Sequence, residues 1–163
     1  MAHGAIFVIA RHKNDVPEYW GEERYYDDGM YGYFVGTVAD SVMQVDDKDL
    51  ELYYEEFNRM PGLEYDPKDK SVKVIDKRQY FEQKFVTLKK AEKKLAEDAT
   101  IEQFFGFDLI GDVYDIKKSY DEGLDYYVDD YDTEFGLETI DMFLRNMRNG
   151  DKFYLGPVTD YHY

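Results

Sequence analysis

The chain has 163 residues, a length typical of one domain, and its 36 Asp and Glu against 20 Lys and Arg give a formal net charge of −16. Cysteine is absent, which excludes disulfides, thiolate zinc sites and cysteine nucleophiles. The negative charge opposes direct binding to nucleic acids and to anionic membranes. Because 44% of the residues are hydrophobic and 18% are aromatic, we expect a folded core rather than disorder.

The N-terminal third of the chain predicts strands and one helix. The apolar run from Ala5 to Ala10 predicts a buried strand, and it is too short to cross a bilayer. No basic leader precedes this run, so we expect no signal peptide. Two runs at 20–26 and 30–38 flank Asp28-Gly29, which predicts a hairpin because glycine accepts the positive φ of a tight turn.

Two further elements precede the middle of the chain. Apolar residues at helical spacing predict a helix over 46–59 that Pro61-Gly62 ends. The runs 63–65 and 71–75 predict a second hairpin around the polar turn 66–70. A long helix over 77–98 follows, with a stripe of apolar residues along one face. The stripe consists of Phe81, Phe85, Leu88 and Leu95, with Ala91 beside it.

The C-terminal half predicts three helices and a strand. Thr100 with Gln103 matches a capping box for a short helix that ends near Gly106, and Ser119 with Glu122 matches another for a helix over 120–131. The remaining elements are a helix over 137–149 and a strand over 152–155.

The element pattern indicates an α+β fold with a small mixed or antiparallel sheet and several amphipathic helices, including the long basic helix 77–98. We expect residues 1–163 to form a single acidic domain. The alternative is two lobes, 1–76 and 99–163, joined by the helix, because a helix of about 20 residues spans about 30 Å.

Motifs for nucleophilic, phosphate-transfer or metal chemistry do not stand out in the sequence. The three histidines, His3, His12 and His162, do not form a helix-spaced metal pair. The segment 130–141 has acids at EF-hand spacing, but Phe135 occupies the position where the loop needs glycine. We therefore expect no catalytic residues, no metal and no cofactor, with an acidic enzyme or a calcium-binding module kept as a third alternative.

The charge is unevenly distributed along the chain. Residues 77–97 hold 7 bases and 3 acids, whereas residues 1–76 hold 17 acids and 8 bases and residues 98–163 hold 16 acids and 5 bases. Such crowding of like charge opposes folding through self-repulsion, and solubility needs a net charge of only roughly 2–8. The excess of acids indicates a function for the negative surface.

Acids recur at helical spacing in two of the predicted helices. Asp121, Asp125, Asp129 and Asp132 form one row and Asp47, Glu51 and Glu55 a second, although like charges at this spacing destabilise a helix by roughly 0.2–0.5 kcal/mol per pair. Four residues of helix rise about 6 Å, a pitch comparable with that of successive phosphates. Neighbouring tyrosines suit an interface, since their rings accept arginine guanidinium groups. The predicted partner-binding residues are Asp121, Glu122, Asp125, Asp129, Asp130, Asp132, Glu134, Asp47, Glu51, Glu55, Tyr126 and Tyr127.

These rows predict an inhibitory binding protein that mimics nucleic acid and occupies the basic groove of a DNA- or RNA-handling protein. In composition the chain is similar to the small acidic anti-restriction and anti-CRISPR proteins of phages and mobile elements; the similarity is one of charge and not of motif. The alternative is an immunity protein or antitoxin that neutralises a basic nuclease toxin. Either role places the chain in the cytoplasm of a bacterial host, without direct contact to nucleic acid or membrane.

The basic helix suggests a second copy of the chain as a further partner. Its lysines partly neutralise the acidic surroundings, and they also suit the acidic face of another copy. A homodimer built through this helix is therefore an additional expectation.

Overall fold

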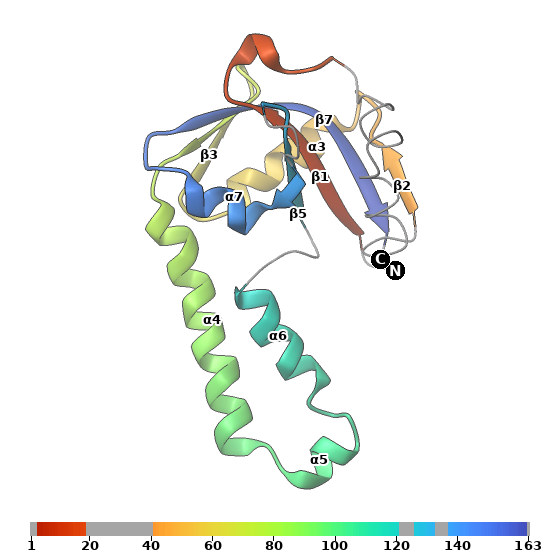
Figure 1. The fold of residues 1–163 in the computed structure, drawn as a ribbon, viewed down its shortest axis with the longest axis vertical. Coiled ribbons are helices and arrows are strands. Elements are labelled where there is room, and N and C mark those ends of the chain that lie inside the picture. Colours follow the sequence, from red (N-terminus) through yellow and green to blue (C-terminus); the bar gives the residue numbers. More distant parts are fainter. Residues whose placement is uncertain (1–2, 19–40, 121–125, 133–136, 163) are drawn as a thin grey trace.

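The computed structural model describes residues 3–18, 41–120, 126–132 and 137–162, and these form an α+β fold, as predicted (Figure 1). Seven strands build one mixed sheet in the order β3-β4-β7-β1-β5-β6, with β2 paired to β7. The strands are β1 (His3–Ala10), β2 (Ser41–Gln44), β3 (Leu63–Asp66), β4 (Ser71–Val74), β5 (Tyr126–Asp130), β6 (Leu137–Thr139) and β7 (Lys152–His162).

Strand β1 lies in the interior of the sheet, which explains its apolar sequence. It pairs parallel with β5 and antiparallel with β7, so both of its edges are hydrogen-bonded. Residues 4–10 are all buried, which suits a strand without an exposed face. The predicted N-terminal strand is therefore confirmed.

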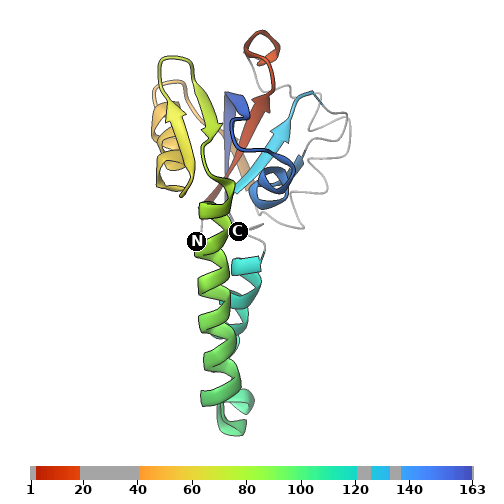
Figure 2. The ribbon, with the colours of Figure 1, turned by 90° about the vertical axis from the view of Figure 1, so that its left-hand side faces the viewer.

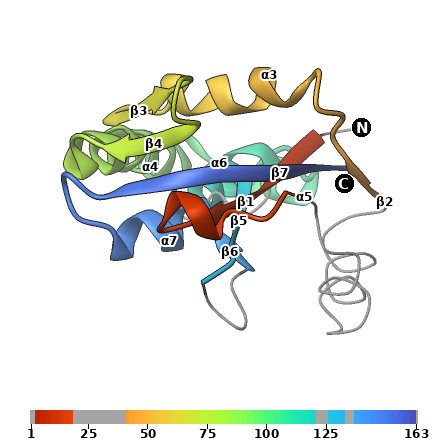
Figure 3. The same ribbon diagram turned by 90° about the horizontal axis from the view of Figure 1, so that it is seen from above.

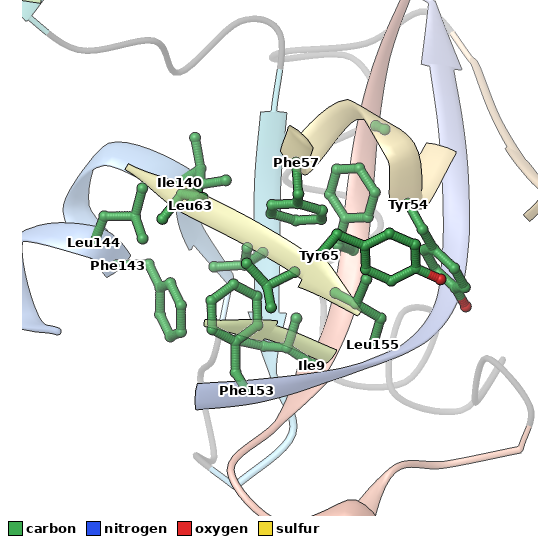
Figure 4. Close-up of a cluster of buried hydrophobic side chains, with 14 of the residues drawn as sticks. Ile9, Tyr54, Phe57, Leu63, Tyr65, Ile140, Phe143, Leu144, Phe153 and Leu155 are labelled. Carbon is green, nitrogen blue, oxygen red and sulfur yellow. The ribbon is translucent and has the colours of Figure 1, made fainter. Parts of the chain in front are cut away.

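Aromatic side chains fill the core where β7 lies between helices α3 (Leu50–Tyr54) and α7 (Ile140–Asn146) (Figure 3). The ring of Phe153 on β7 contacts Phe57 at 5.8 Å and Phe143 at 5.1 Å between centroids, both edge to face (Figure 4). Phe57 also lies 4.8 Å from Phe7 of β1. These rings connect the sheet to the helices on either side of β7, and edge-to-face pairs contribute about 0.5–1.5 kcal/mol each beyond the area that they bury.

A long helix, α4 (Lys77–Asp98), has the predicted bounds. The side chain of Asp76 caps it by accepting the N–H groups of Arg78 and Gln79. After α4 the chain turns back through α5 (Ile101–Phe105) and α6 (Ile110–Tyr120), and α6 packs antiparallel along α4. We call residues 77–120 the arm and the other described residues the head. The arm projects from the sheet with α5 at its far end (Figures 1 and 2).

Two other local predictions are confirmed near the arm. Strands β3 and β4 pair antiparallel as the predicted hairpin. Thr100 and Gln103 form the predicted capping box of α5, each side chain accepting the other residue's backbone N–H. Both features depend on neighbours within a few residues, which is why sequence spacing identifies them.

The predicted helix over 120–131 is wrong for the part that the structure describes. Residues 126–130 form strand β5, in parallel pairing with β1. Ser119, expected to cap this helix, lies instead in the last turn of α6, where its hydroxyl donates to the carbonyl of Asp115. Helix α6 itself was not predicted.

Three further boundaries differ from the predictions. The helix expected over 46–59 begins at Leu50 and continues from Glu55 to Arg59 as a 3-10 helix, η2. The helix expected over 137–149 divides into β6 and α7, because the side chain of Thr139 caps a new helix start. The final strand, predicted over 152–155, continues through Gly156-Pro157 to His162 as β7. A second short 3-10 helix, η1 (Lys13–Asp15), follows β1. The hairpin predicted around Asp28-Gly29 lies outside the described residues.

The sheet combines strands from both halves of the chain. Strands β1 to β4 come from residues 1–76, and β5 to β7 come from residues 99–163. The division of the chain into domains stays a prediction. No helix among the described residues is both long enough and apolar enough to traverse a lipid bilayer.

Candidate acidic interface

The segment formed by α3 and η2 is held against the head by its buried side chains. Tyr54 and Phe57 are buried, and the hydroxyl of Tyr54 donates to the carbonyl of Gly156 at 2.7 Å. Glu51 and Glu55 lie one helical turn apart and are exposed, as is Asp47 in the turn before α3. We call Asp47, Glu51 and Glu55 the acidic row. Their outward position follows from the inward position of the two aromatics.

Few cations offset the charge of this segment. Lys48 contacts Asp46 at 3.4 Å and Asp49 at 4.0 Å, and Arg59 contacts Glu56 at 2.5 Å. Within the part of the chain that the structure describes, no lysine or arginine lies within ion-pair distance of the acidic row. The row therefore presents uncompensated negative charge to solvent.

Tyrosines next to the acidic row remain neutral hydrogen-bond donors. The hydroxyl of Tyr65 donates to Glu51 Oε2 at 3.1 Å, and that of Tyr53 donates to Asp160 Oδ2 at 3.1 Å. Burial, followed by the charge of Asp160, raises the pKa of Tyr53 to about 12. Burial and the hydrogen bond to Glu51 also raise the pKa of Tyr65. These donors fix carboxylates in place without cancelling their charge.

The second predicted row does not lie on a helix in the described residues. Asp129 and Asp130 belong to β5 and are 1% and 4% exposed. Asp132 follows the strand and is exposed. Asp121, Glu122, Asp125 and Glu134 lie outside the described residues. The spacing of four was therefore misleading, because parallel pairing with β1 outweighs the local helical pattern.

Arg11 explains how one of these aspartates is buried. Its Nε and Nη2 donate to Asp130 Oδ2 at 3.3 and 3.1 Å, and its backbone N–H donates to Asp132 Oδ2 at 2.6 Å. The guanidinium also lies 4.8 Å from the centroid of the Phe143 ring. Sequence analysis missed Arg11, although a base directly after an apolar strand was an available signal.

Glu138 lies near the same group of charges. Burial raises the pKa of Glu138, the charge of Asp130 raises it further, and Arg11 acts in the opposite direction. At the two ends of the EF-hand-like spacing, Asp130 is paired with Arg11 and Asp141 with Lys84. Among the described residues, no three His, Asp or Glu side chains are grouped so that they would hold a metal ion.

The two tyrosines predicted as interface anchors are half-buried in the head. Tyr126 lies 6.1 Å from the ring of Phe7, and its hydroxyl donates to Glu56 Oε2 at 3.3 Å. The ring of Tyr127 lies 6.2 Å from that of Tyr161. Both rings therefore contribute to packing, and the hydroxyl of Tyr126 contacts Glu56, the residue next to Glu55 of the acidic row.

A cavity of about 340 Å³ lies where the arm joins the head. Acidic and basic side chains both line it, so it does not concentrate one sign of charge. The charged lining residues are Glu56, Arg59, Lys84, Asp115 and Lys118. This balance contrasts with the acidic row, where one sign predominates.

Comparisons with protein-family models, with curated proteins and with solved structures give no match. Geometry and charge are therefore the basis of the function proposed below.

Proposed function

We propose that this chain is an inhibitory binding protein whose acidic row enters the basic, nucleic-acid-binding site of a DNA- or RNA-handling protein. The role corresponds to that of the anti-restriction and anti-CRISPR proteins of phages and mobile elements. Asp47, Glu51 and Glu55 are exposed, and no lysine or arginine of the described residues lies within ion-pair distance of them; this observation carries the proposal. Asp121, Glu122, Asp125 and Glu134 stay predicted contacts, and exposed Asp132 joins them.

The geometry of the acidic row suits a site built for phosphates. Four residues of helix rise about 6 Å, so Glu51 and Glu55 are spaced comparably with successive phosphates on a strand. Tyr54 and Phe57 are buried and hold the segment against the head. Because the segment is already ordered, less conformational entropy is lost when the row binds. Opposite potentials would also accelerate the encounter, and added salt would slow it.

Charge reversal provides the direct test. The variant Asp47→Lys/Glu51→Lys/Glu55→Lys and the wild type are each immobilised and exposed to bacterial lysate at low and at high salt. A protein retained only by the wild type, and only at low salt, is then assayed for binding to its nucleic acid. We expect the wild type to block that binding and the variant to block it at least about tenfold less well.

A matched control keeps the change in net charge the same. Glu92, Glu97 and Asp98 are exposed on α4, and reversing these three to Lys adds the same positive charge at a distance from the row. The control should inhibit as the wild type does. Equal loss of inhibition in both variants would mean that net charge, and not the acidic row, determines binding, and the proposal would be wrong.

A further inference from the structure

The far end of the arm combines exposed rings with acids. Phe104, Phe105 and Phe107 are 67%, 76% and 78% exposed. They lie on and directly after α5, which is the part of the arm most distant from the sheet (Figure 1). Residues 98–116, which we call the acidic tip, hold five acids and no lysine or arginine. A contiguous group of large exposed apolar residues marks an interaction surface, and the acids state which charge its partner carries.

Three acids of the tip are exposed and unpaired. No lysine or arginine of the described residues lies within ion-pair distance of Asp98, Glu102 or Asp108. Asp112 differs from them, because Nζ of Lys94 on α4 lies 2.6 Å from its Oδ1. The tip therefore suits a surface that is both apolar and basic.

A groove with these two properties lies on α4. Its volume is about 600 Å³, and its lining includes Phe85 and Val86, which are 59% and 50% exposed. Lys90 in the groove has no ion-pair partner among the described residues. The charged lining residues are three lysines and one acid, namely Lys89, Lys90, Lys93 and Glu92. The groove is thus the basic, apolar counterpart of the acidic tip.

The length of the arm decides how the tip and the groove can meet. Phe85 precedes the end of α4 by 13 residues, which is about 20 Å of helix, so the tip lies far from the groove of its own copy. Two arms placed antiparallel remove this separation, because each tip then lies beside the groove of the other copy.

The antiparallel arrangement also keeps the acidic heads apart. Outside residues 77–120 the chain holds 28 acids and 11 bases, so two heads repel each other at close range. Helix α4 is about 33 Å long, and the register that joins tip to groove separates the heads by roughly 40 Å. This separation is several times the Debye length of about 8 Å at physiological salt, so little of the repulsion remains.

We propose that two copies of this chain form an antiparallel dimer through their arms, in which the acidic tip of each copy docks in the α4 groove of the other. The rings of the tip cover Phe85 and Val86, and its carboxylates face the lysines. A twofold axis relates the two contacts and closes the assembly. The homodimer expected from the sequence brings the basic helix onto an acidic face, and the tip supplies that face. The acidic row lies on the head, so the two proposals stand or fall separately.

Exchange of charge between the tip and the groove tests the dimer without any other protein. One variant reverses the groove lysines: Lys89→Glu/Lys90→Glu/Lys93→Glu. The other reverses the unpaired acids of the tip: Asp98→Lys/Glu102→Lys/Asp108→Lys. Each variant alone places like charges at both contacts, so it should dimerise at least about tenfold less tightly than the wild type in sedimentation equilibrium. An equimolar mixture restores opposite charges at both contacts and should dimerise as the wild type does.

The outcomes separate this contact from general charge effects. Reversal of the tip makes the chain less negative, so general repulsion alone would tighten the dimer of that variant. A wild type that stays monomeric at about 200 µM would overturn the proposal and leave the tip to a different protein. Dimerisation of both single variants at wild-type strength, or a mixture that associates no better than either variant, would contradict it as well.

Removal of rings tests the apolar part of the contact. Phe104→Ser/Phe105→Ser should weaken dimerisation at least about tenfold, because the rings no longer cover the groove. Met43→Ser on the head shortens a similarly exposed apolar side chain and should leave dimerisation unchanged. Circular dichroism verifies that each variant is folded. A ring variant that is folded and dimerises as the wild type does would show that the tip is not the contact.

Discussion

The hydroxyl of Tyr80 donates a hydrogen bond of 2.6 Å to Oδ1 of Asp141, a residue with no exposed surface in the first turn of α7. Lys84, one turn further along α4, places its Nζ 2.8 Å from the other carboxylate oxygen. The base of the arm is thereby joined to the head through one buried carboxylate. The position of Asp141 near the start of a helix also suits its negative charge.

Replacing Lys84 by Met should destabilise the protein by about 3–5 kcal/mol, because the buried carboxylate of Asp141 loses its lysine. Urea unfolding followed by circular dichroism measures the change. Arg78→Met is the control, since it removes an exposed pair with Glu82 on the same helix and should have little effect. Equal stability of Lys84→Met and the wild type would mean that the ion pair with Lys84 is not needed to keep the Asp141 carboxylate buried.

Glu138 gives a pH-dependent prediction. Because burial raises its pKa in the folded state, the folded protein binds the proton more tightly than the unfolded chain does. The free energy that this tighter proton binding adds to folding is fully present below the usual glutamate pKa. It is lost as the pH rises through the raised pKa of Glu138 in the folded protein. Glu138→Gln should therefore match the wild type near pH 4 and be more stable than it at pH 8, as measured by urea unfolding. Indistinguishable stability at both pH values would argue against the raised pKa.

Tyr54 should make the protein sensitive to alkali. Burial, with smaller contributions from Glu51 and Asp47, raises its pKa to about 12 from the ordinary 10.0. The unfolded chain therefore ionises first, and stability falls as the pH rises from 10 toward 12.

Tyr54→Phe isolates this effect. At pH 7 the variant should lose about 1–2 kcal/mol, because the buried carbonyl of Gly156 loses its donor. At pH 11 the difference from the wild type should narrow, because phenylalanine has no proton to lose. Tyr120→Phe, at an exposed position, is the control and should show neither effect. A constant difference across this range would contradict the assignment.

Gly62 allows no side chain. It has a φ of +77°, and a Cβ would lie 2.0 Å from the carbonyl oxygen of Asp76, next to the start of α4. Its own carbonyl accepts the N–H groups of Ile75 and Asp76. Gly62→Ala should lower the free energy of unfolding by about 2–4 kcal/mol, as measured by thermal or urea unfolding.

Gly111→Ala is the opposite case. A Cβ at this position of α6 meets open space, so the substitution should raise the free energy of unfolding by up to about 1 kcal/mol.

The elements that were predicted correctly depend on nearby residues. Asp76 caps α4, Thr100 and Gln103 cap α5, and a short polar turn joins β3 to β4. Caps and turns act over three or four residues, so their energies are visible in the sequence itself. The α+β class and the long helix follow from such local patterns.

The failed predictions depend on partners far along the chain. Residues 126–130 carry acids at helical spacing, yet they pair with β1, and Arg11 reaches Asp130 across 119 positions. Pairing with the edge of β1 outweighs the helical preference of residues 126–130, and the half-exposed guanidinium of Arg11 offsets the desolvation of the Asp130 carboxylate.

Composition and local spacing by themselves determined the acidity, the fold class and the elements with local caps. Tertiary structure alone decided which carboxylates face solvent and which are neutralised, since that depends on what packs against them. It also decided that Phe104, Phe105 and Phe107 are exposed at the end of an arm. Sequence periodicity reports a residue's neighbours on its own element, whereas exposure is set by the elements that fold against it.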